Sequence, residues 1–173
     1  MAYPNAYVMI EFVLGNRRLR LYPDGKITSR AFNRGKETKK DTWRVISFKN
    51  HIGYFKCEIT VDGISRSFAK HRLIYLAHNP EWDIFDNSKD NYIDHINRNP
   101  SDNSIENLRV VTQQHNQFNR DGRGYCWCKS RNKWQAQITL NGKVIGLGRF
   151  VKEEDARAAY LEAKARLHVI PVS

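Results

Sequence analysis

Residues 91–119 constrain the fold more than any other stretch of this 173-residue chain. A short apolar run ends in the pair Asp94-His95, and turn-forming residues follow over residues 97–103. Residues 107–111 are rich in β-branched side chains and predict a second strand. From Thr112, the expected N-cap, the pattern becomes polar and helical, with Asn116 one turn into the helix. The stretch therefore predicts a strand, a loop, a strand and a helix that bring an acid, an imidazole and an amide together.

These residue types suit metal-assisted cleavage of a phosphodiester bond. The carboxylate of Asp94 and the amide oxygen of Asn116 are hard ligands, which favour magnesium or manganese over zinc. Successive strand residues point to opposite faces, so one member of the Asp94-His95 pair can hold the metal while the other activates a water. A metal held there would stabilise the charged phosphorane and the leaving 3′ oxygen. An Asp-His dipeptide is also common on ordinary surfaces, so the prediction depends on the full spacing.

The full spacing resembles an HNH nuclease module of the phage and intron homing-endonuclease type. The similar segments are HRLIYLAH at residues 71–78 and YIDHINRNPSDNSIENLRVVTQQHN at residues 92–116. They contain the family's sequence features in order: Asp94-His95, Asp102-Asn103, Asn107-Leu108-Arg109 and Asn116. The resemblance implies that Asp94 and Asn116 are metal ligands, that His95 is the general base, and that Asn107 braces the loop by bonding its backbone. Asn97-Arg98 stands where an acidic residue and a glycine are usual.

Net charge is +11 for the whole chain and is unevenly distributed. Residues 1–50 carry +7, residues 51–112 carry −2 and residues 113–173 carry +6. Two basic flanks around a slightly acidic middle suit a protein that holds a polyanion on both sides of a metal site. Nucleic acid is the favoured partner, and the alternatives are a merely solvated basic surface and an anionic membrane.

The number of cysteines and the hydropathy of the chain indicate the cellular compartment in which it works. The three cysteines include a C-x-C pair, which argues against a disulfide framework and against a zinc knuckle. No apolar run approaches the roughly 20 residues of a membrane span, and the N-terminal residues lack the features of a signal peptide. We therefore expect a reduced, cytoplasmic protein without a membrane partner, in the host cytoplasm if a phage encodes it.

Residues 1–78 predict mainly strands that lead into one helix. Strands are expected over residues 6–14, 26–29, 43–48, 54–61 and 64–68. Residues 33–41 form a basic loop that either is mobile or contacts phosphate, and Asp62-Gly63 forms a hairpin turn. Residues 70–78 predict a helix from which His71 can approach the site. The acidic linker that follows is expected to pack Trp82 and Phe85 against the core.

Beyond a glycine-bearing basic joint at residues 120–124, the chain predicts a second small unit. Strands are expected over residues 125–129, 134–140 and 143–150, with Asn141-Gly142 as a type I′ turn. Residues 153–167 predict an amphipathic helix. The helix should cover one face of the sheet and leave the other free to display Trp127, Lys129 and Arg131.

This tail is similar to the DNA-binding domain of the ethylene-response-factor (Apetala-two) type. The matching pieces are Gly124-Tyr125, Trp127, KWQAQI at residues 133–138, GLGRF at residues 146–150, and the alanines and Tyr160 of the helix. In that family the sheet lies in the major groove. The resemblance implies that bases and phosphates are contacted by Trp127, Lys129, Arg131, Trp134, Gln137 and Arg149. Trp134 has an equally plausible place in the core beneath the helix.

The sequence thus predicts an α+β protein: N-terminal antiparallel strands leading into a ββα-metal (HNH) module, then a three-stranded sheet packed on one helix. The expected domains are residues 1–69, 70–120 and 121–173. The leading function is a site-specific homing-type endonuclease that cuts double-stranded DNA with Mg²⁺ or Mn²⁺, acting as a monomer. The alternatives are a DNA-binding regulator with a decayed nuclease module and a protein that binds or cleaves RNA. The complete set of Asp94, His95, Asn107 and Asn116 favours the enzyme, and a groove-reading sheet favours duplex DNA.

Overall fold

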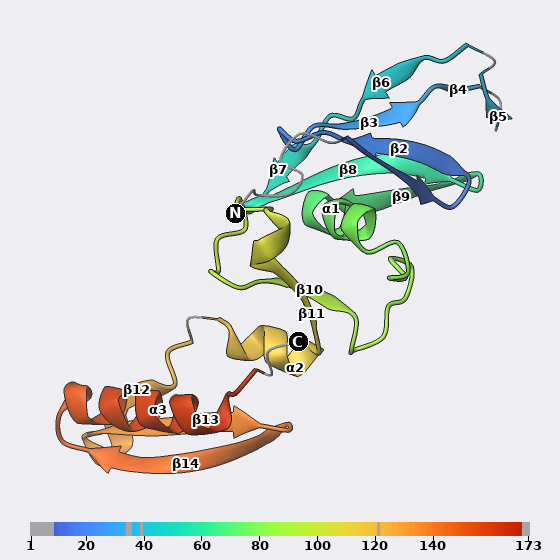
Figure 1. The fold of residues 1–173 in the computed structure, drawn as a ribbon. Helices are drawn as coiled ribbons and strands as arrows, with labels where there is room; N and C mark the ends of the chain where they lie inside the picture. The colour runs from blue at the N-terminus through green and yellow to red at the C-terminus, as the bar shows by residue number, and fades with distance from the viewer. Residues whose placement is uncertain (1–8, 34–35, 39, 121, 171–173) are drawn as a thin grey trace, which may run out of the picture. The chain divides into compact units, whose positions relative to one another are not determined.

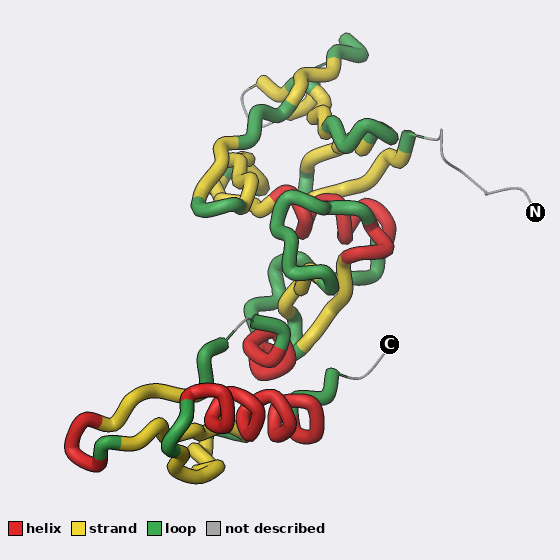
Figure 2. The backbone as a smooth tube through the Cα atoms, turned by 90° about the vertical axis from the view of Figure 1, so that its left-hand side faces the viewer, coloured by secondary structure: helices red, strands yellow, loops and turns green. Residues whose placement is uncertain are grey.

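The computed structural model describes residues 9–33, 36–38, 40–120 and 122–170 (Figures 1 and 2). The chain divides into two compact units, and the division does not follow the predicted domains. The first unit contains residues 1–88 and 95–109, and the second contains residues 89–94 and 110–173. The predicted mixture of antiparallel sheets, a ββα region and a C-terminal sheet on a helix is confirmed, so the fold class is α+β.

The first unit begins with a four-stranded antiparallel sheet in the order β1-β2-β3-β6. Alternation along the strands sends Leu14, Leu19 and Ile27 into the core, where each is almost fully buried. The sheet was only partly predicted, because three arginines within five residues hid the alternation of β2. Of the predicted strand 6–14, residues 10–14 form β1, residue 9 is not in a strand, and residues 6–8 lie outside the described residues. The strands are β1 (Ile10–Leu14), β2 (Arg17–Leu21), β3 (Ile27–Arg30) and β6 (Trp43–Val45), and the two-residue strands β4 (Phe32–Asn33) and β5 (Lys36–Glu37) pair with each other.

A second antiparallel sheet, β7-β8-β9, feeds directly into the first helix. Asp62 and Gly63, the predicted hairpin turn, both have positive φ, as a type I′ turn requires. Phe85 packs edge-on against Phe68, which confirms that the linker folds back onto this unit. The elements are β7 (Lys49–His51), β8 (Tyr54–Val61), β9 (Ile64–Ala69) and α1 (Lys70–His78).

The central stretch forms the expected strand, loop, strand and helix. β10 (Tyr92–His95) pairs with β11 (Leu108–Val111), and a 3₁₀ turn over Ile105–Asn107 precedes β11. The short helix α2 (Gln113–Phe118) starts where predicted, because the Thr112 side chain accepts a hydrogen bond from the His115 N–H. This arrangement places the loop residues 96–104 between two paired strands.

The second unit ends in a three-stranded antiparallel sheet crossed by a helix, which Figure 1 shows in orange and red. Ala136 and Ile138 of the central strand are buried beneath Tyr160 and Ala163 of the helix. The elements are β12 (Tyr125–Cys128), a 3₁₀ turn (Lys129–Arg131), β13 (Lys133–Leu140), β14 (Lys143–Phe150) and α3 (Glu153–Leu167). No helix within the described ranges is both long and apolar enough to span a membrane.

Candidate functional site

The loop after β10 is held by one buried side-chain amide, that of Asn107. Its Oδ1 accepts a hydrogen bond from the Asn97 N–H at 2.9 Å. Its Nδ2 donates to the Asp102 carbonyl at 2.8 Å and to Asn97 Oδ1 at 3.0 Å. One residue at the end of the 3₁₀ turn, directly before β11, therefore bonds to both ends of the loop, which fixes the backbone that follows His95.

The loop turns at Arg98, which has a φ of 64°. This left-handed conformation is cheap for glycine and costly for a side chain with a Cβ, so arginine is strained here. The Asn97 side chain offsets part of that cost, because its Oδ1 accepts a hydrogen bond from the Asn99 N–H at 2.8 Å. The loop thus keeps its turn although the glycine usual in HNH modules is absent.

His95 is buried, with 5% of its surface exposed, and its ring is oriented by Asn103. His95 Nε2 lies 3.1 Å from Asn103 Oδ1, while Asn103 Nδ2 donates to the Ser101 carbonyl at 3.3 Å. Because an amide oxygen only accepts, the proton of the neutral ring belongs on Nε2 and Nδ1 is an acceptor. Asn103 belongs to the loop motif, but no role was predicted for it, because the motif does not indicate that its side chain bonds to the His95 ring.

A second imidazole lies against the first. The ring centroids of His71 and His95 are 5.0 Å apart, with the planes at 70°. Burial, followed by the charge of His95, lowers the pKa of His71 to about 3. His71 is therefore neutral at physiological pH. As expected from the sequence, it approaches the site from the helix, and it does so by packing against the ring of His95.

Asp94 belongs to the second unit, whose boundary with the first falls between residues 94 and 95. Its buried carboxylate receives the Asn119 amide, with Nδ2 at 2.9 Å from Oδ1 and 3.0 Å from Oδ2. Asn116, the other predicted ligand, is half-buried on α2 three residues before Asn119. Residues three apart are neighbours on a helix surface. The spacing of Asn119 from the predicted ligand Asn116 is therefore the sequence signal that could have identified Asn119 as a residue of the site.

These oxygen donors fit a hard divalent cation. Carboxylate and amide oxygens suit Mg²⁺ or Mn²⁺, and Mg²⁺ commonly takes only one or two protein carboxylates plus waters and substrate phosphates. Among the described residues, no group of three or more His, Cys, Asp or Glu side chains is arranged for a metal. Asp94 with Asn116 would therefore be a sparse magnesium-type site that depends on substrate for further ligands.

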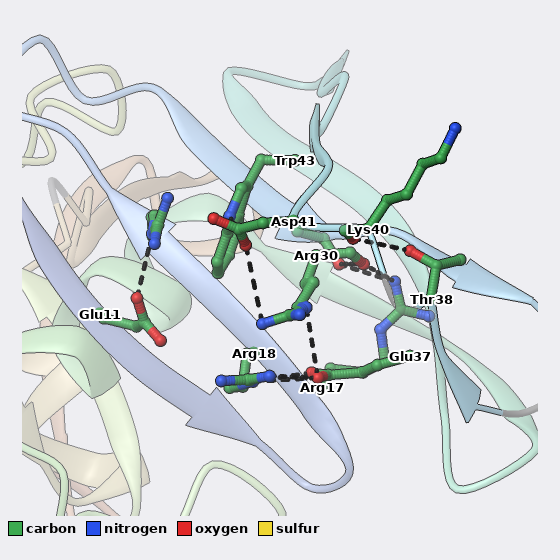
Figure 3. Close-up of polar contacts among 11 residues, drawn as sticks. Glu11, Arg17, Arg18, Arg30, Glu37, Thr38, Lys40, Asp41 and Trp43 are labelled. Carbon is green, nitrogen blue, oxygen red and sulfur yellow. Dashed lines mark hydrogen bonds and ion pairs between the residues drawn. The ribbon is translucent and has the colours of Figure 1, made fainter.

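The basic N-terminal flank is partly neutralised by its own acidic residues (Figure 3). Arg18 and Arg30 both approach the Glu37 carboxylate, and hydrogen bonding from Arg18 lowers the pKa of Glu37. Arg20 pairs with Glu11 at 3.0 Å and stacks 3.7 Å above the Trp43 ring. The net charge of +7 for residues 1–50 already counts these acidic partners, and the contacts show that Arg18, Arg20 and Arg30 are paired within the flank.

The C-terminal sheet separates the six predicted DNA-contacting residues into three places. Gln137 alternates with the buried Ala136 and Ile138, and Arg149 pairs opposite Gln135, so both side chains point away from α3. Lys129 and Arg131 are exposed in the 3₁₀ turn between β12 and β13.

The expectation that Trp127 lies on the free face is wrong. Trp127 pairs directly with Trp134, and Trp134 has the same strand parity as the buried Ala136 and Ile138. Directly opposite residues project to one side, so both indoles lie on the helix side, with ring centroids 5.5 Å apart. Sequence alone did not give the register of β12 against β13.

Comparison with known families decides what the central segment is. The HNH endonuclease family matches residues 68–118, which include α1, β10, the braced loop, β11 and α2. Residues 68–118 form an HNH endonuclease domain. HNH endonucleases are metal-dependent phosphodiester hydrolases that act on DNA, and the predicted enzyme class is thereby confirmed for this domain. The family typically uses a divalent metal.

One curated relative comes from a phage. The chain is 33% identical to protein 3.8 of Escherichia phage T7 over 60 residues, which cover 30% of this chain and 50% of that protein. The chain is therefore related to a phage protein, and it spans about half the length of the relative it matches. No solved structure matches the chain significantly.

Proposed function

We propose that the whole protein is a site-specific, homing-type endonuclease that hydrolyses phosphodiester bonds in duplex DNA. The observation that carries the proposal is the ordered loop of the HNH domain, in which Asn107 braces the backbone and Asn103 orients the buried His95. The proposal includes action as a monomer in the cytoplasm of the cell that harbours the gene.

In this proposal His95 is the general base. Its Nδ1 takes a proton from a water molecule while the water oxygen attacks phosphorus, and the bond from phosphorus to the 3′ oxygen breaks. The proton on His95 Nε2 stays there and is donated in a hydrogen bond to Asn103 Oδ1, which leaves Nδ1 as the accepting nitrogen. Asn107 acts by fixing the loop, so its contribution is positional.

Asp94 and Asn116 would hold the divalent metal, Mg²⁺ or Mn²⁺. When bound there, the metal would stabilise charge on the phosphorane and on the leaving oxygen. Asn119 supports Asp94, because two N–H···O contacts orient the carboxylate. Asp94→Asn keeps the size of the side chain and removes its charge, so it should weaken metal-dependent cleavage without disturbing packing.

Sequence recognition is assigned to the C-terminal sheet, in the manner of the Apetala-two resemblance. Gln137 and Arg149 are exposed on the face opposite α3, and Arg149 lines a hollow of about 450 Å³ together with Lys133, Gln135, Gly146 and Gly148. Glycines keep that face flat enough to approach a groove. Lys129 and Arg131 would contact phosphates from the adjacent turn, whereas Trp127 and Trp134 lie on the helix side of the sheet and receive no DNA contact in this proposal.

The test of the enzyme is cleavage of a supercoiled plasmid carrying the target, with nicked and linear products resolved on a gel. The wild-type protein should cut in Mg²⁺ and stop in EDTA. Cutting that persists in EDTA would contradict the metal mechanism. Tight DNA binding without any cleavage, in Mg²⁺ and in Mn²⁺, would instead favour the non-enzymatic regulator.

The test of recognition compares two arginines of one unit. Arg149→Ala, on the free sheet face, should cost about 1–3 kcal/mol of binding if the side chain reads a base edge. Arg157→Ala removes the same charge from the exposed side of α3 and serves as the control. Gel shifts with specific and scrambled duplexes decide the matter, and equal losses from both variants would contradict recognition by the sheet.

A further inference from the structure

The ring of Tyr54 contacts both histidines of the HNH domain. Its centroid lies 5.6 Å from that of His71 and 6.0 Å from that of His95. Tyr54 begins β8 and precedes the segment 68–118 that matches the HNH family. The N-terminal region therefore supplies one of the two rings that contact the general base.

The hairpin that carries Tyr54 is fixed to the same loop. Ile52 and Gly53 have positive φ, and the Asn50 side chain accepts a hydrogen bond from the Gly53 N–H, which closes the turn. A Cβ at Gly53 would lie 3.1 Å from Pro100 Cγ, so the turn packs closely against the loop that follows His95. The position of Tyr54 is thus set from two sides, by its strand and by this contact.

His95 needs these ring contacts for its orientation. The contact with Asn103 at Nε2 fixes one end of the imidazole, but a single hydrogen bond permits the ring to tilt about it. His71 meets the ring of His95 at 70° and Tyr54 meets it at 51°, so the two rings together limit that tilt. Proton transfer demands that Nδ1 point at the attacking water, because misplacement by about 1 Å can cost about 10²-fold in rate.

We propose that Tyr54 is a positioning residue of the nuclease site, holding the imidazole of His95 through its ring and not through its hydroxyl. The catalytic part of this proposal rests on the function proposed above. Tyr54 is 41% exposed, so its truncation opens no buried cavity and the variants should fold.

The experiment uses the full chain and three variants. Tyr54→Leu should lower kcat about 10- to 100-fold while KM stays near the wild-type value. Tyr54→Phe keeps the ring and should retain the wild-type kcat. Tyr75→Leu is the matched control, because Tyr75 packs edge-on against Trp82 at 5.3 Å in the same unit, and it should lower Tm and leave kcat unchanged.

A second readout does not depend on cleavage. The imidazole ¹⁵N signals of His95 should show one tautomer, with the proton on Nε2, in the wild-type protein and in Tyr54→Phe. In Tyr54→Leu they should move toward the tautomer average of a mobile ring. A wild-type protein that fails to cut would overturn the proposed function, while these signals would still decide the role of Tyr54. Unchanged kcat and unchanged signals in Tyr54→Leu, or equal losses in the Leu and Phe variants, would overturn the inference.

Discussion

Replacement of Asn107 should remove the hydrogen bonds that hold the loop. The loss in free energy of unfolding can be worked out from those bonds. Asn107→Ala removes one acceptor and two donor contacts, which leaves the Asn97 N–H and the Asp102 carbonyl without that partner. Leaving a buried polar group unpaired costs about 1–3 kcal/mol. Asn97 is exposed and water can replace its partner, so we expect a total loss of about 2 kcal/mol.

Asn107→Asp is the sharper variant. A carboxylate still accepts from the Asn97 N–H, but it places an oxygen against the Asp102 carbonyl and Asn97 Oδ1, where an N–H stood. We therefore expect Asn107→Asp to be at least as destabilised as Asn107→Ala, although it is the closer isostere. Urea denaturation measures both, with the exposed Asn99→Ala as a control from the same loop. An Asp variant as stable as the wild-type protein would refute the hydrogen-bond pattern.

Three further changes test other parts of the structure. Below about pH 6.5 the unfolded chain protonates His71 while the folded protein, with a pKa of about 3 at this residue, does not. Stability should therefore fall by about 1.4 kcal/mol on acidification to about pH 5.5, and urea denaturation should show that His71→Phe lacks this contribution. Arg98→Gly relieves the left-handed strain at φ 64° and should raise stability by about 1 kcal/mol, visible as a higher Tm; a Tm equal to or below the wild-type value would contradict the strain at this residue. Gly124→Ala places a Cβ 2.0 Å from the Tyr160 ring and should cost about 1–3 kcal/mol; an unchanged Tm would contradict the packing of α3 on the sheet.

Local signals were sufficient where a segment has one strong period. The predicted bounds of α1, β8, β14 and α3 coincide with the observed ones, because apolar spacing and the turn dipeptides define both the type and the ends of these elements. β2 was missed because Arg18 and Arg20 alternate with the buried Leu19 and Leu21 and pair with Glu37 and Glu11, some of which lie far away in sequence.

The candidate site was predictable as a motif but not as a set of contacts. Spacing identified Asp94, His95 and Asn107, whereas the hydrogen bonds of Asn103 to His95 and of Asn119 to Asp94 depend on how loop and helix pack. The face on which Trp127 lies depends on strand register, which a shift of one residue would reverse. Contacts and strand register between segments distant in sequence were thus not predictable from the sequence.

The measurement that tests the central claim most directly is single-turnover cleavage of target duplex by the wild-type protein and by His95→Ala in Mg²⁺, with DNA affinity measured in parallel. Loss of the general base should lower the cleavage rate by about 10²–10⁴-fold while affinity stays near the wild-type value. A His95→Ala protein that cuts at the wild-type rate would contradict the assignment of the base and, with it, the account of how this HNH domain works.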